Sequence, residues 1–112
     1  MSLASELHAC LSEMLHGPVP EAGEADDPVR FFKQWLAERN LGLVPINDAA
    51  EFDWPGQWIA VFRDGQGEHA LVMFGSPSGV WLDPSNAYRE GAHIEAGWIL
   101  TDRKSTRLNS SH

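Results

Sequence analysis

Apolar residues recur at helical spacing in two segments near the start of the chain. Ser2 can cap the first helix, and Gly17-Pro18 can end it. Asp27-Pro28 can begin the second, which extends to Asn40, with a capping carboxylate and a proline at the first helical position. The apolar stripes are Leu3, Leu7, Cys10, Leu11, Met14 and Leu15 in the first helix and Phe31, Phe32, Trp35 and Leu36 in the second. The pattern predicts two amphipathic helices joined by a solvated acidic loop at 18–27.

The rest of the chain is typical of short strands separated by turns. Apolar segments occur at 43–46, 58–63, 69–74, 80–83 and 97–100, and Pro45 indicates that the first of them is an edge strand. Gly-containing turns at 64–67 and 75–79 separate the central three. We therefore predict an α+β fold in which two N-terminal helices pack on a small antiparallel sheet arranged as a meander.

The last eleven residues, 102–112, differ from the rest in composition. They are polar and basic with one apolar residue, and they resemble the translation of a common sequencing adapter. We therefore predict a single domain over 1–101, followed by a non-native tail over 102–112 that plays no part in the fold.

Charge restricts the partners that the protein can bind. The 112 residues include 8 Lys and Arg against 16 Asp and Glu, a formal net charge of −8. Such a surface repels nucleic acids and anionic membranes, so we expect neither as a partner, and it attracts a basic peptide or protein. One cysteine and the absence of a secretory leader favour the reducing cytoplasm.

His69 and Asp83 are the first candidates for chemistry. They lie on consecutive predicted strands, and pairing symmetric about Pro77 makes them diagonal neighbours on one face of the sheet. A carboxylate on one ring nitrogen fixes the histidine tautomer and raises the basicity of the other nitrogen, as a general base requires. The alternative interpretation is a strand-end histidine in solvent and an aspartate that starts an Asx-Pro turn.

Cys10 is the candidate nucleophile. Placed opposite His69, its thiol would complete a Cys-His-Asp arrangement. The alternative is a small core residue, because Cys10 lies in line with Leu7 and Met14 on the apolar stripe.

Trp54 is the candidate for binding a partner, because Pro55-Gly56 beside it favours an exposed position at a groove. No motif indicates a cofactor or a metal ion. His8 and His16 could share a helix face, but a third ligand at suitable spacing is lacking.

The order of several segments carries a family resemblance. They are the helix 9–15 with Gly17-Pro18 after it, the helix segment 32–43, His69-Ala70-Leu71-Val72 and Asp83-Pro84. The chain thereby resembles small papain-like domains of bacteria and phages, similar to the peptidase C39-like group. In that group a Cys begins the first helix, a His begins a central strand as His-Ala-hydrophobic-Val, and Asp-Pro ends the next strand. The resemblance implies a papain-like fold, with His69 as the base and Asp83 as the residue that orients it.

The nucleophile position departs from that family pattern. In Cys-x-x-Ala-x-Leu-x-x-x-Leu, the register set by Ala9, Leu11 and Leu15 places Glu6 at the Cys position and Cys10 one helical turn later. No Gln or Asn precedes Glu6 to contribute to an oxyanion hole.

Two functions of different classes follow. The first is a thiol hydrolase acting on peptide or amide bonds, in which Cys10 attacks, His69 transfers the proton, Asp83 orients the imidazole and backbone N–H groups stabilise the oxyanion. The second is a non-enzymatic acidic binding module, such as an immunity-type or phage accessory protein, that covers a basic partner. A structural domain without either role is a third, plainer outcome.

Overall fold

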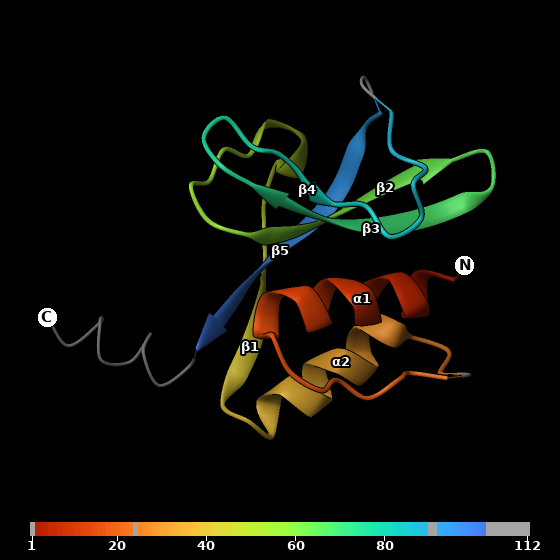
Figure 1. Ribbon diagram of the computed structural model, residues 1–112, viewed down its shortest axis with the longest axis vertical. Helices are drawn as coiled ribbons and strands as arrows, with labels where there is room; N and C mark the ends of the chain where they lie inside the picture. The colour runs from red at the N-terminus through yellow and green to blue at the C-terminus, as the bar shows by residue number, and fades with distance from the viewer. Residues whose placement is uncertain (1, 24, 90–91, 103–112) are drawn as a thin grey trace, which may run out of the picture.

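Two helices lie side by side against one face of an antiparallel sheet (Figure 1). The computed structural model describes residues 2–23, 25–89 and 92–102. The helices are α1 (Leu3–Leu15) and α2 (Pro28–Ala37), with a short 3₁₀ helix η1 (Ala49–Glu51) after β1. The strands are β1 (Leu41–Pro45), β2 (Trp58–Asp64), β3 (Gly67–Phe74), β4 (Gly79–Leu82) and β5 (Ile94–Asp102). The predicted α+β class, with two N-terminal helices on an antiparallel sheet, is therefore confirmed.

The helix ends follow the local sequence signals. Ser2 and Ser5 form a capping box at the start of α1, and the Asp27 side chain accepts a hydrogen bond from Arg30 N at the start of α2. The left-handed residue that ends α1 is His16, directly before the predicted stop. The second helix ends at Ala37, and Asn40 then adopts a left-handed conformation (φ 60°) that turns the chain into β1.

The strand order, β1-β5-β2-β3-β4, differs from a meander at one point. The segment β2-β3-β4 is a meander, but β5 lies between β1 and β2 and pairs with both. The reason is that β5 has apolar side chains on both faces: Ala96 and Trp98 pack on the helix side, whereas Ile94 and Ile99 pack on the other. A strand that is apolar on both sides is stable in the interior of a sheet, and β1 with Pro45 takes the edge.

The sheet separates two apolar cores. On the helix side, Leu7 and Leu11 of α1 and Phe32 and Leu36 of α2 pack against alternate residues of β2 and β3. On the far side, the intervening residues of β2 and β3 pack beneath η1 and the segment before β5. That second core comprises Ala49, Trp58, Ala60, Phe62, Leu71, Met73 and Ile94. Neither face of the central strands is therefore left to solvent.

The predicted non-native tail falls largely outside the described residues. Only Asp102 is described, and it is the last residue of β5, where it pairs with Leu41. Residues 103–112 lie outside the described ranges.

Gly97 provides a test of the packing between β5 and β2. A Cβ atom at this position would lie 2.7 Å from a ring carbon of Trp58 and 3.1 Å from the carbonyl oxygen of Ile59. We expect Gly97→Ala to lower the free energy of unfolding in urea by about 1–3 kcal/mol, because the Trp58 ring must move within a close-packed core. Gly79→Ala is the matched control, since open space surrounds its Cβ position, and it should change stability by less than about 0.5 kcal/mol. Equal losses in the two variants would contradict this account.

Candidate functional site

The carboxylate of Glu6 is fully buried between α1 and β3. It has no solvent-exposed area, and both of its oxygens lie 3.2 Å from Nδ1 of His69. The backbone N–H of Ala70 donates a third hydrogen bond to Oε1, at 3.0 Å. A buried charge of this kind requires compensation by donors or an opposite charge, and β3 provides both.

His69 lies between two carboxylates. Its Nδ1 faces Glu6, and its Nε2 lies 3.1 Å from Oδ1 of Asp64, close enough for an ion pair but without the angle of a hydrogen bond. Burial lowers the pKa of His69, but the carboxylates of Glu6 and Asp64 outweigh burial, so that the pKa is raised above its ordinary value. The imidazole is thus stabilised in its charged form, as the central cation of an acid–base–acid cluster.

Strand geometry explains both contacts. Pairing between β3 and β4 covers Val72 to Phe74, so the N–H of Ala70 on the same strand is available to Glu6. His69 pairs with Phe62 of β2, and Asp64 stands two residues further along β2 on the same face. Asp64 is therefore the diagonal neighbour of His69.

Asp83 lies elsewhere, in the turn after β4. Leu82 pairs with Val72, as symmetry about Pro77 predicts, but the strand ends there. The Asp83 carboxylate accepts hydrogen bonds from the backbone N–H of Tyr88 at 2.9 Å and from the hydroxyl of Ser85 at 3.1 Å. The structure favours the second interpretation of Asp83, a turn-forming residue. The ring nitrogens of His69 face Glu6 and Asp64 and not Asp83.

Cys10 lies in the helix-side core, one turn after Glu6 in α1. It has no exposed area and packs among Leu7, Leu11 and Phe32. Burial, together with the negative charges of Glu6 and Asp83, raises the pKa of the thiol to about 12. A nucleophilic cysteine needs the opposite environment, a nearby cation and partial exposure, so the geometry of Cys10 is that of a core residue.

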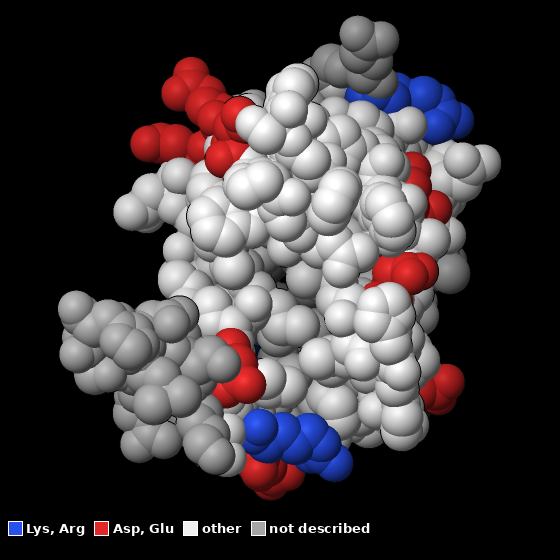
Figure 2. All heavy atoms as spheres, turned by 60° about the vertical axis from the view of Figure 1, so that its left-hand side comes forward, with Lys and Arg blue, Asp and Glu red and all other residues white. Residues whose placement is uncertain are grey.

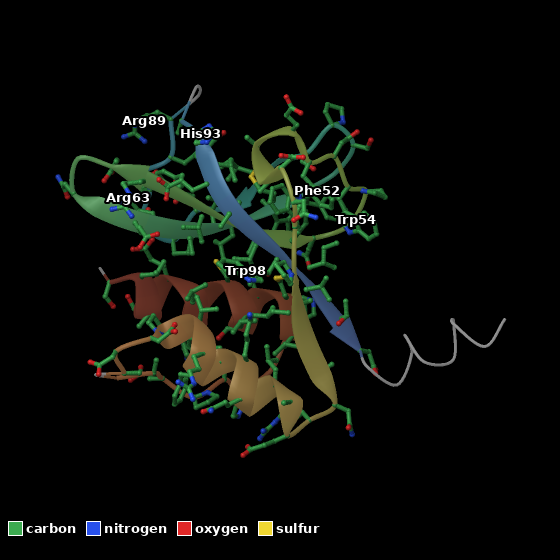
Figure 3. The ribbon with its side chains drawn as sticks, turned by 180° about the vertical axis from the view of Figure 1, so that it is seen from behind. Phe52, Trp54, Arg63, Arg89, His93 and Trp98 are labelled. Atoms are coloured by element: carbon green, nitrogen blue, oxygen red, sulfur yellow. The ribbon has the colours of Figure 1, made fainter. Side chains whose placement is uncertain are left out.

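Trp54 is partly exposed, as the sequence predicts. Its side chain is 38% exposed and stacks on Phe52 with ring centroids 5.9 Å apart, on the side of the molecule away from the helices (Figure 3). Phe52 in turn meets the buried Trp58 edge-on, at 5.1 Å. Trp54 is therefore the outer member of an aromatic stack that reaches into the far-side core.

The four predicted site residues do not form one site. His69 lies at the interface of α1 and β3, Cys10 in the core, Asp83 in a turn and Trp54 on the far side. The structure brings together Glu6, His69 and Asp64, and the chemical roles of Glu6 and Asp64 were missed from sequence. A signal for Glu6 exists, because a charged residue stands on the buried stripe between Leu3 and Leu7.

Comparisons with protein-family models, curated proteins and solved structures find no match for this chain. The papain-like resemblance therefore depends on the residues of this chain alone. Within the described residues, the helices are too short and too polar to cross a bilayer. In the same part of the chain, no three His, Cys, Asp or Glu side chains are grouped to hold a metal ion.

The raised pKa of His69 leads to a pH-dependent stability. Because the folded protein binds this proton more tightly than the unfolded chain, the stabilisation is complete below about pH 6.5 and is lost as pH rises through the pKa of folded His69. We expect Glu6→Gln, which removes charge but retains an acceptor for Ala70, to lower the pKa of His69 and to reduce stability by about 1–3 kcal/mol at pH 5.5 and by less at pH 8.5. Urea unfolding at each pH and NMR titration of the imidazole would measure both effects.

Asp64→Asn is the matched variant for that titration. The Asp64 side chain is 36% exposed, so solvent screens its charge, whereas Glu6 is enclosed. The pKa of His69 should therefore fall less in Asp64→Asn than in Glu6→Gln, and the reverse order would contradict the assignment of Glu6 as the main partner.

Proposed function

We propose that the protein is a non-enzymatic domain of papain-like type that binds a basic protein partner. The observation that carries the proposal is the contact between Glu6 and His69. In the family pattern that the sequence resembles, residue 6 is the place of the catalytic cysteine and residue 69 that of its base. Glu6 and His69 occupy these two positions and are in contact. The positions therefore fit the resemblance, but position 6 carries a carboxylate and not a nucleophilic thiol.

The alternative, a thiol hydrolase, is weakened by three features of the site. The thiol of Cys10 is enclosed and its pKa is about 12, so it is protonated at neutral pH. Both ring nitrogens of His69 face carboxylates, which stabilise the charged imidazole and oppose its action as a base. The carboxylate of Asp83 forms a turn. A hydrolase would have to rearrange all three residues.

Charge supports a basic partner. The excess of acidic residues gives a formal net charge of −8, and many of these side chains stand at the margins of the face shown in Figure 2, around a broad uncharged area. The negative sign of the surface selects a positive partner and speeds the encounter. We place this function in the cytoplasm, because the one cysteine is free and buried.

The equivalence of residue 6 with the nucleophile position can be tested with a moved thiol. In Glu6→Cys combined with Cys10→Ala, the introduced thiol faces His69, and the charged imidazole should lower its pKa below about 8.5, the value of a free cysteine. In the wild type, the thiol should remain protonated to beyond pH 10. Thiolate absorbance at 240 nm measures both, with Cys10→Ala alone as the baseline. A thiol at position 6 that titrates no lower than a free cysteine would contradict the papain-like assignment.

Partner binding is tested with a random twelve-residue peptide library displayed on phage, selected on the immobilised protein. We expect enriched sequences to be rich in Lys and Arg. Their affinity should fall steeply between 50 and 500 mM salt, because the distance over which exposed charges are screened shortens from about 14 Å to about 4 Å over this range. Enrichment of neutral or acidic sequences alone, or of none, would overturn the proposed function. A general fluorogenic amide substrate serves as the parallel assay, in which we expect no turnover.

A further inference from the structure

The strand β4 lies at the edge of the sheet but has apolar side chains on both faces. Val80 pairs with Met73 and therefore lies on the far side of the sheet, whereas Leu82 packs against the helix-side core. Among the described strands, β4 pairs with β3 alone, and its outer edge is left unpaired by the others (Figure 1). The strand β5, which is also apolar on both faces, lies between two neighbours. By the same physical rule, a further strand beside β4 would stabilise this edge.

This edge also presents three large apolar side chains to solvent. Phe74, Val80 and Trp81 are exposed, and the rings of Phe74 and Trp81 are in contact, with centroids 5.1 Å apart. Edge strands usually carry charged residues or proline, which prevent association with a strand of another chain. The other edge strand, β1, contains Pro45, whereas β4 contains neither proline nor a charged residue. The edge at β4 is therefore open to pairing with another chain.

Charge indicates which chain can use this edge. The segment 74–82 contains no Lys, Arg, Asp or Glu, although the formal net charge of the chain is −8. The acidic side chains that border it are engaged locally: Asp53 accepts a hydrogen bond from the Ser76 hydroxyl at 2.8 Å, and Asp83 is held in its turn. A basic partner finds no opposite charge on β4, whereas two copies of an acidic chain repel each other least through an uncharged surface. The charge pattern favours a second copy of this chain.

We infer that the protein forms a dimer in which the β4 strands of two copies pair antiparallel about a two-fold axis. The sheets of the two copies then form one continuous sheet. Phe74, Val80 and Trp81 of each copy pack against the other copy. A two-fold contact uses the same surface on both copies, so association stops at the dimer. This inference goes beyond the proposed function, and neither depends on the other.

The area of the contact determines its strength. An aromatic side chain buries about 150–250 Å² when it is fully covered, so the exposed parts of Phe74, Val80 and Trp81 together offer roughly 300 Å² per copy. A standard interface takes about 800 Å² per partner. The strand has four residues, and Trp81 has no partner on β3 because the register shifts there, which limits the number of hydrogen bonds. We therefore expect a weak dimer, with a Kd of about 0.1–1 mM.

Sedimentation equilibrium of the full chain between about 20 μM and 1 mM tests for this dimer. We expect the mass to rise from that of one copy toward that of two and no further. In ¹H–¹⁵N NMR, the amide signals of residues 79–82 should shift with protein concentration. The dimer should be roughly two- to fivefold tighter in 500 mM than in 50 mM salt, because salt screens the repulsion between two acidic copies. Binding of a basic partner has the opposite salt dependence.

The decisive comparison makes the same substitution on the two edge strands. Val80 of β4 is 46% exposed, and Val44 of β1 is 47% exposed. Val80→Lys places a charge within the contact and should weaken the dimer roughly tenfold or more. Val44→Lys changes the net charge equally and should dimerise as the wild type does. Trp81→Thr, which introduces another residue that favours strands, is a second variant and should weaken the dimer roughly three- to tenfold.

Several results would overturn the inference. They are a monomer at every concentration, growth beyond two copies, equal weakening by Val80→Lys and Val44→Lys, and concentration-dependent NMR shifts that map to the helices or to β1. Urea unfolding shows whether each variant is folded, and if Val80→Lys is not, a folded Trp81→Thr variant that dimerises as the wild type does would overturn the inference instead. The phage selection tests the proposed function separately, because it uses the binding of basic peptides and not the mass of the protein.

Discussion

The buried carboxylate of Glu6 fixes how the helix layer sits on the sheet. A charge without exposed area is destabilising unless donors or an opposite charge compensate it, and here the compensating groups are the imidazole of His69 and the N–H of Ala70, both on β3. The contact can form only if α1 crosses β3 where pairing with β4 has stopped. The position of Cys10 follows, because one further helical turn carries it into the core. One ionic contact therefore determines which residue of α1 faces the histidine.

Much of the fold could be predicted because its signals are local. Capping residues, apolar periodicity and glycine-containing turns act within a few residues, and Ser2, Asp27 and Pro45 had the effects that their chemistry predicts. The place of β5 could not be predicted, because insertion between β1 and β2 depends on contacts with strands distant in the sequence. The alternation of its apolar residues between two cores is visible only once those cores exist.

At the candidate site, too, local features could be predicted and contacts between distant segments could not. The register of β4 on β3 was predictable only in part: Val72 pairs with Leu82, as symmetry about Pro77 predicts, but Met73 and Phe74 pair one residue away from that symmetry, across a bulge. The partners of His69 were not predictable, because a strand has a neighbour on each side and either neighbour can carry the diagonal carboxylate. The carboxylate is on β2, at Asp64, and a second one comes from a helix more than sixty residues away in sequence. Periodicity within a strand does not reveal which neighbour supplies a partner.

These contacts also separate ionisable groups that are satisfied within the protein from those that are exposed. Where α1 meets β3, the charges of Glu6, His69 and Asp64 meet one another, and the Cys10 thiol is held in its neutral form. On the far side of the sheet, Asp48 and Glu51 at the 3₁₀ helix η1 are exposed. A group already satisfied within the protein contributes little to recognition, whereas an unpaired charge beside apolar surface can still gain a partner. The position at which the family resemblance directs the search for catalysis is therefore occupied by an ionic contact that is already satisfied within the protein.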